Sequence, residues 1–62
     1  MTINRLYQHD GVDMPIGISD ELEAWTLVLP EAAAEMVYIP LDRISADDFE
    51  AALLEDGYRR IW

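Results

Sequence analysis

The sequence predicts an α+β fold, in which a small antiparallel sheet of three to five short strands packs one main helix, about residues 46–56, on one face. Two observations predict this class. Several short runs rich in β-branched and aromatic residues alternate between apolar and polar positions, as half-buried strands do. One later segment carries helix signals at both ends. The 62 residues are expected to form a single compact domain, residues 1–62.

Two strands and a turn are predicted in the first part of the chain. Residues 3–8 alternate imperfectly with a period of two, which indicates a strand. His9, Asp10 and Gly11 follow as a turn, because an Asp-Gly pair tolerates positive φ angles. We expect residues 12–18 to return as a weaker strand that Pro15 and Gly17 interrupt.

Residues 19–29 allow two interpretations. Ser19 could cap a helix, because acidic residues follow it and apolar residues recur at helical spacing. Residues 25–29 instead alternate cleanly up to Pro30, which favours an acidic turn that leads into a strand. We favour the strand, and we expect it to pair antiparallel with residues 36–41. Pro40 then marks a sheet edge or a strand end, and residues 30–35 are expected to form one helical turn.

The best-defined element is the helix over residues 46–56. Ser45 and Asp48 have the spacing of a capping box, with Asp in place of Glu, and Gly57 stands at the C′ position. We expect residues 58–62 to add a last strand. The apolar stripe of the helix should contain Ala46, Phe49, Ala52 and Leu53, with Leu54 at its flank.

The aromatic side chains are expected in the core or at its margin. This prediction covers Trp25, Tyr38, Phe49 and Tyr58. Trp62 has two interpretations, because it could either cover the core or stand exposed as an anchor for a partner.

The net charge excludes whole classes of function. Thirteen acidic residues and four arginines, with no lysine, give a formal charge of −9. A protein that binds nucleic acid or an anionic membrane directly must neutralise phosphates with basic residues, so both classes are excluded. The chain also has no cysteine, no apolar leader and no membrane-length apolar run, and we expect it in the cytoplasm.

The sequence predicts no enzyme. The single histidine, His9, precedes a turn and is expected to be an exposed loop residue without a catalytic partner. The paired acids lack the alternating ligand pattern of a calcium loop, and the glycines are too scattered for a phosphate loop. We therefore expect no catalytic residue, no cofactor and no built metal site.

The acidic residues can either keep a small apolar protein soluble or form a binding surface. Clustered carboxylates can imitate a nucleic-acid backbone and occupy the basic groove of a nucleic-acid-binding protein. No basic residue lies between residues 10 and 35, and the helix acids are expected to share one solvent-facing side. We predict that a monomeric protein binds such a partner through Asp20, Glu21, Glu23, Asp47, Asp48, Glu50 and Glu55.

In size, acidity and lack of cysteine the whole chain resembles the small phage and mobile-element proteins that disable bacterial defence, in particular the anti-CRISPR proteins that act on type I effector complexes. The resemblance is most specific over residues 37–62 and rests on no shared motif. It implies a stoichiometric inhibitor in the host cytoplasm that binds a Cas subunit, with a type I-C effector as the expected target, and blocks DNA recognition or nuclease recruitment.

Two other functions stay open. An antitoxin-like protein would neutralise a basic toxin by the same electrostatics. A small subunit of a larger assembly would carry an exposed apolar patch, expected around Leu54 and Trp62.

Overall fold

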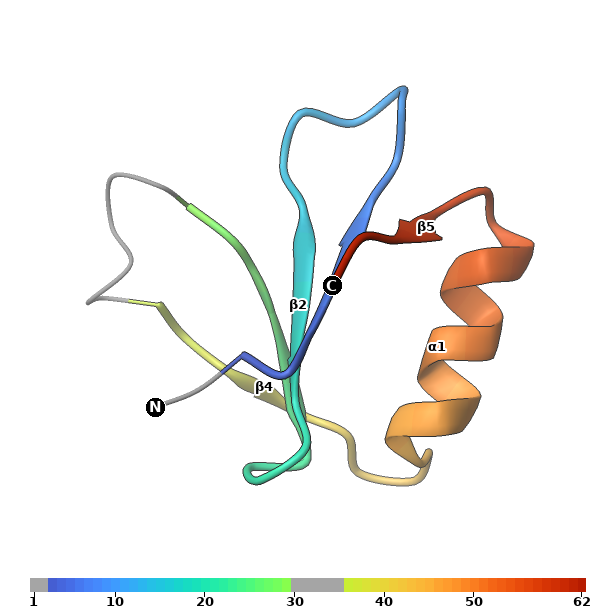
Figure 1. The fold of residues 1–62 in the computed structure, drawn as a ribbon. Coiled ribbons are helices and arrows are strands. Elements are labelled where there is room, and N and C mark those ends of the chain that lie inside the picture. The colour runs from blue at the N-terminus through green and yellow to red at the C-terminus, as the bar shows by residue number, and fades with distance from the viewer. Residues whose placement is uncertain (1–2, 30–35) are drawn as a thin grey trace.

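The computed structural model describes residues 3–29 and 36–62 and confirms the α+β class (Figure 1). A five-stranded antiparallel sheet has the strand order β4-β3-β2-β1-β5. The elements along the chain are β1 (Arg5–Gln8), β2 (Ile16–Ser19), β3 (Ala24–Leu27), β4 (Ile39–Pro40), α1 (Ala46–Glu55) and β5 (Arg59–Arg60).

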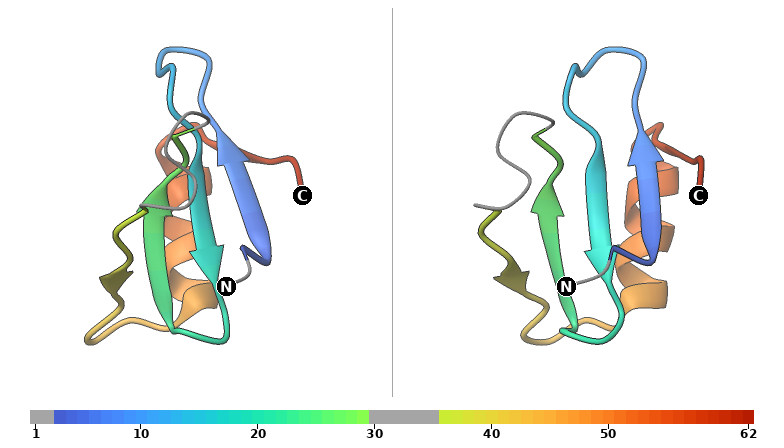
Figure 2. Two further views of the ribbon diagram at one scale, coloured as in Figure 1. Left: turned by 90° about the vertical axis from the view of Figure 1, so that its left-hand side faces the viewer. Right: turned by 60° about the vertical axis from the view of Figure 1, so that its left-hand side comes forward.

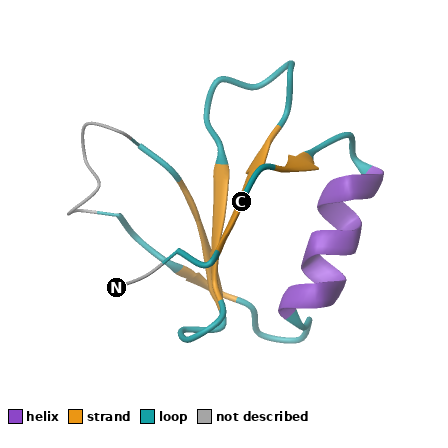
Figure 3. Ribbon diagram, in the orientation of Figure 1, coloured by secondary structure: helices purple, strands orange, loops and turns teal. Residues whose placement is uncertain are grey.

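The connection through α1 determines the shape of the molecule. The first four strands form a meander, in which each strand pairs with the one before it. The chain then leaves β4 at one edge of the sheet, passes through α1 along one face, and reaches the other edge, where β5 pairs with β1 (Figure 2, Figure 3). Helix α1 is therefore the single helical layer over the described part of the sheet.

The second strand is shorter than predicted. We expected a strand over residues 12–18, but β2 begins at Ile16, directly after Pro15, because Pro15 has no N–H to donate to the ladder. Gly17 does not break the strand. A Cβ atom there would lie 3.0 Å from the Ile3 side chain and 3.2 Å from that of Val28. The glycine thus allows these two side chains to pack closely on the sheet face opposite α1.

The strand interpretation of residues 19–29 is confirmed, and the helix interpretation is wrong. Ser19 ends β2 and pairs with Ala24, the first residue of β3. The Ser19 hydroxyl accepts a hydrogen bond from the Leu22 N–H at 3.2 Å and so holds a turn. Glu23 has a φ of 49°, in the left-handed region, and an α-helix cannot continue through that conformation.

The predicted pairing of the third and fourth strands is also confirmed. Trp25 lies opposite Ile39, and Ala24 lies opposite Pro40. Strand β4 contains only two residues at the sheet edge, as Pro40 indicated. The predicted helical turn over residues 30–35 lies outside the described residues. The last strand was predicted over residues 58–62 but is shorter, because β5 contains only Arg59–Arg60.

Both ends of the helix follow their sequence signals. The Ser45 hydroxyl accepts a hydrogen bond from the Asp48 N–H at 3.1 Å. The helix ends at Glu55, one residue before the predicted end. There the N–H of Tyr58 reaches the carbonyl of Leu53 at 3.0 Å, and the N–H of Gly57 reaches that of Leu54 at 3.2 Å. This is a Schellman motif around Gly57, whose φ is 97°.

The core lies between α1 and the sheet. Its buried members are Tyr7, Ile16, Ile18 and Leu53, and half-buried Trp25, Leu41, Ala46, Phe49 and Tyr58 pack against them. The Trp25 and Phe49 rings join β3 to α1 with a centroid separation of 5.8 Å. Tyr38 is half-buried, as expected for the margin of the core.

Two predictions about the apolar residues are decided by these positions. Ala52 is exposed, so its predicted place in the core is wrong, because the buried stripe of α1 runs through Ala46, Phe49 and Leu53 and leaves Ala52 beside it. Trp62 is 67% exposed and does not cover the core.

Gly57→Ala is expected to lower the free energy of unfolding by about 1–2 kcal/mol, because an L-residue is strained at this φ angle. The new Cβ would also lie 3.0 Å from the His9 ring. Gly11→Ala is the matched control, since its Cβ would be 3.4 Å from the same ring, an ordinary contact. Urea denaturation measures both variants. Equal stabilities would contradict the assigned C-cap.

Candidate partner-binding surface

The fold gathers acidic residues from three separate segments at one end of the molecule. These segments are the β2–β3 turn, the loop after β4 and the first turn of α1, which lie together at the lower end of Figure 1. The N–H of Leu41, at the end of β4, donates to the Glu23 carbonyl at 2.8 Å and so ties the loop to the turn. We call this surface the acidic end, and it consists of Asp20, Glu21, Glu23, Asp42, Asp47 and Asp48.

Arg5 lies at the centre of these carboxylates. Its guanidinium contacts Asp20 at 3.2 Å, Asp47 at 2.9 Å and Glu50 at 3.3 Å. The Arg5 side chain is only 15% exposed, whereas those of Asp20 and Asp47 are 46% and 84% exposed. The contact with Asp47 is the main cause that raises the pKa of Arg5 above its ordinary value, so the guanidinium keeps its charge. One half-buried cation therefore holds three acids in place, and two of them still face solvent.

Glu50 has a different position from the one predicted. We expected it in water beside the other helix acids, but its side chain is only 19% exposed. Its two oxygens accept hydrogen bonds from Arg5 and Arg60, each at 3.3 Å. Because Arg60 belongs to β5, Glu50 connects the helix to both β1 and β5. Its place in the structure is that of a link inside the fold, and its role in partner binding stays a prediction.

The other predicted site residues divide between the two ends of the helix. Glu21, Glu23 and Asp48 are exposed and belong to the acidic end, and no arginine of residues 3–29 or 36–62 forms an ion pair with them. Glu55 is exposed at the C-terminal end of α1, away from the acidic end. The expected row of solvent-facing helix acids is therefore wrong at Glu50, which is half-buried, whereas Asp47, Asp48 and Glu55 are exposed along α1 as predicted.

Asp42 belongs to the acidic end and was not among the predicted site residues. A signal for it existed in the sequence. The predicted pairing of residues 25–29 with residues 36–41 places the loop after the second strand beside the turn before the first. Asp42 stands in that loop, so strand pairing alone brings it next to Glu23.

His9 is more enclosed than expected. It lies in the predicted turn, but the side chain is half-buried and its Nδ1 accepts a hydrogen bond from the Gly11 N–H at 2.9 Å. The ring packs edge-on against Tyr58 at a centroid distance of 5.0 Å. The expectation of an exposed loop residue is wrong, because His9 packs between the β1–β2 loop and the end of α1.

Within the described residues, no three histidine or carboxylate side chains come together in a way that could hold a metal ion. No helix in this part of the chain is long and apolar enough to cross a bilayer. In comparisons of the chain with protein-family models, characterised proteins and solved structures, nothing matched. The candidate surface therefore rests on its own geometry and charge.

Tyr7 lies beneath the ion pairs and carries an unusual hydroxyl. The side chain is fully buried, and its hydroxyl has no hydrogen-bond partner among residues 3–29 and 36–62. Burial raises the pKa of Tyr7 above 10.0, and the nearby Glu50 carboxylate adds to the increase. Both effects favour the neutral phenol in the folded protein.

Arg5→Gln is expected to lower the free energy of unfolding by about 2 kcal/mol, because it leaves the carboxylates of Asp20, Asp47 and Glu50 together without their shared cation. The matched control is Arg59→Gln. Arg59 pairs with Asp10 at 2.7 Å, but these side chains are 61% and 85% exposed. Chemical denaturation should show a change below about 0.5 kcal/mol for the control. Equal losses in the two variants would contradict the central role of Arg5.

Tyr7→Phe is expected to raise the free energy of unfolding at neutral pH by about 1 kcal/mol, because it removes a buried hydroxyl without a partner. The raised pKa of Tyr7 means that its neutral form contributes stability that is complete below pH 10.0 and is lost as pH rises through the folded-state value. The variant should therefore lose less stability than the wild type above that pH.

Denaturation at neutral and at alkaline pH measures both effects, with Tyr58→Phe as the control, since Tyr58 is half-buried. A Tyr7→Phe variant with the same alkaline loss as the wild type would show that this phenol is not the group that titrates.

Proposed function

We propose that this protein is a stoichiometric inhibitor whose acidic end occupies the basic surface of a nucleic-acid-binding protein. The observation that carries the proposal is that Arg5 contacts acids of the β2–β3 turn and of α1 at once. Two acidic segments distant in sequence thereby become one surface. The resemblance to anti-CRISPR proteins suggests the specific target, a subunit of a type I CRISPR effector, with type I-C as the first to test.

The carboxylates of the acidic end are held in place before any partner binds. The carboxylates of Asp20 and Asp47 are positioned by Arg5, and the capped first turn of α1 fixes the backbone of Asp48. A surface that needs little ordering on binding loses less conformational entropy than flexible acidic side chains would. Electrostatic attraction to a basic groove then increases the association rate, and that increase falls as salt screens the charges.

Two alternative functions use parts of the same structure. An antitoxin-like protein would bind a basic toxin through the acidic end, and the identity of the bound protein distinguishes it from an anti-CRISPR. A subunit of a larger assembly is favoured by a different observation, the exposure of Leu54 and Trp62 at 48% and 67%. That function predicts either self-association or a partner whose binding does not depend on the acidic end.

Substitution of Glu21 and Glu23 by Gln and of Asp42 by Asn is expected to abolish partner binding and leave the fold intact. The reason is that these acids stand at the acidic end but outside the ion pairs of the described residues. The matched control replaces Asp10, Asp13 and Asp56 by Asn. It removes an equal number of charges from the β1–β2 loop and the end of α1, where Asp10 belongs to the exposed ion pair with Arg59.

Pull-down from host lysate with the wild type and both triple variants, followed by mass spectrometry, measures the effect. A Cas subunit, a basic toxin and a second copy of the chain give distinct identities. A partner that both variants retain equally would contradict the proposed surface. The rate of association with the purified partner should also fall steeply between about 50 and 200 mM salt. An association rate that does not change with salt would contradict an electrostatic mechanism.

A further inference from the structure

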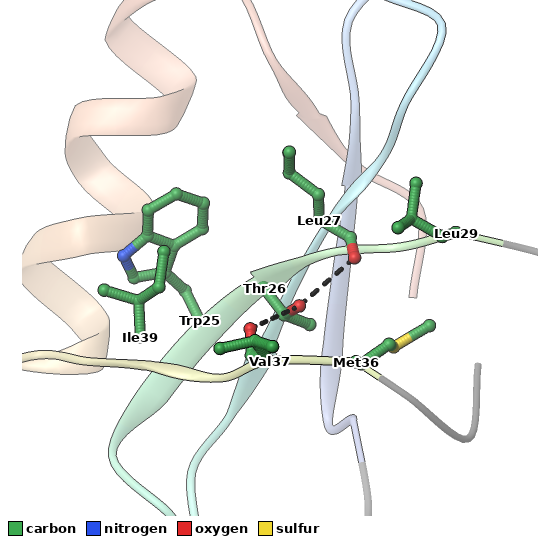
Figure 4. Close-up of a pocket in the computed structure, with 7 residues that line it drawn as sticks. All are labelled: Trp25, Thr26, Leu27, Leu29, Met36, Val37 and Ile39. Carbon is green, nitrogen blue, oxygen red and sulfur yellow. Dashed lines mark hydrogen bonds between the residues drawn. The ribbon is translucent and has the colours of Figure 1, made fainter. Parts of the chain in front are cut away.

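A shallow apolar groove lies on the outer side of β3, where α1 no longer covers the sheet. It has a volume of about 230 Å³ and lies between β3 and the chain that leads into β4 (Figure 4). We call it the edge groove, and its apolar walls are Trp25, Leu27, Leu29, Met36, Val37 and Ile39.

The chemistry of the edge groove suits apolar side chains. Among the described residues that line it, only Thr26 is polar, and its hydroxyl shares one proton between the carbonyls of Leu27 and Val37, each at 3.1 Å. The hydroxyl is therefore satisfied within the wall. Val37 is 78% and Ile39 46% exposed, so an apolar surface around the groove faces solvent. Exposed apolar surface of this kind is typical of a binding site, because its burial is favourable.

The two edges of the sheet differ in a way that favours the groove edge for binding. Strand β5 consists of Arg59 and Arg60, and charged residues on an edge strand discourage the addition of another strand. Strand β4 carries no charged residue, but it contains only Ile39 and Pro40, and Pro40 has no N–H to donate, so a segment bound there is held by side-chain contacts and not as an added strand. Ile39 presents its side chain to the groove at this edge.

The charges beside the edge groove indicate its occupant. Glu23 and Asp42 flank the end of the β3–β4 ladder, where the Leu41 N–H binds the Glu23 carbonyl. A second copy of the chain would bring another net charge of −9 to this position, and like charges across an interface oppose association. A basic segment would instead find carboxylates directly beside an apolar wall.

We propose that the edge groove binds an extended segment of the basic partner in which apolar side chains alternate with lysine or arginine. Alternate side chains of an extended segment point to opposite sides. One set then fills the groove, and the long basic side chains nearest the end of the β3–β4 ladder bend back to Glu23 and Asp42. This inference rests on the proposed function, because it assigns to the same basic partner a second contact next to the acidic end.

The test uses three short synthetic peptides and isotope-labelled full-length protein. The first peptide alternates valine with lysine, the second replaces valine by serine, and the third replaces lysine by glutamate. We expect the valine–lysine peptide to shift the amide signals of residues 25–27 and 37–39. The double variant Val37→Thr, Ile39→Thr should bind it about tenfold more weakly, since a hydroxyl replaces a methyl group of Val37 and the ethyl group of Ile39 in the groove.

The control double variant Val12→Thr, Ile61→Thr changes exposed apolar residues elsewhere and should bind the valine–lysine peptide as the wild type does. Several results would overturn the inference. One is equal binding of the serine–lysine peptide, and another is equal binding of the valine–glutamate peptide. A third is self-association through the groove in place of peptide binding, and a fourth is binding of no peptide at all.

Failure of the groove is distinguishable from failure of the proposed function, because Glu23 and Asp42 take part in both contacts whereas Val37 and Ile39 belong to the groove alone. A partner that is lost with the acidic-end variant but retained with the Val37→Thr, Ile39→Thr variant would support the acidic end and overturn the groove. A partner retained with the acidic-end variant would contradict the proposed function whichever peptide binds.

Discussion

The Arg5 guanidinium is the interaction on which the acidic end depends. Three carboxylates from the β2–β3 turn and α1 meet at a side chain that is only 15% exposed, and each of them would repel the others without it. A strongly acidic protein of this size must place its acids apart or compensate them locally. Here the positive charge of Arg5 lies beneath the carboxylates that it compensates. Asp20 and Asp47 remain exposed, so the surface that faces solvent is negative.

Glu50 links the acidic end to the rest of the fold. It shares Arg5 with the acidic end but also binds Arg60 on β5, so the helix, the first strand and the last strand meet at one carboxylate. The packing beneath is thin, with Tyr7, Ile16, Ile18 and Leu53 as its buried members. In so small a core, ion pairs that connect elements distant in sequence help to define which edge β5 joins. The surface and the fold therefore share residues.

Local signals explain which parts of this structure the sequence predicts. The helix caps at Ser45 and Gly57, the alternation of residues 25–29 and the antiparallel partner of that strand all depend on neighbours in the chain, and all are confirmed. The burial of Glu50 and the exposure of Ala52 depend on where the helix lies relative to β1 and β5. Helical periodicity alone does not predict these positions. It identifies the apolar face of a helix, but it does not show which residues of the sheet contact that face.

The topology makes the surface depend on contacts between distant parts of the chain. Strands β1 to β4 pair with their immediate neighbours, whereas β5 must find β1 across almost the whole described chain, with Tyr7 opposite Arg60. Contacts that close long loops cost more chain entropy, and they form late when the sequence is synthesised from its N-terminus. Arg5 and Asp20 thus leave the ribosome well before Asp47 and Glu50. Because Asp47 and Glu50 lie on α1 and Arg5 lies on β1, the binding surface is complete only when α1 has folded back onto β1.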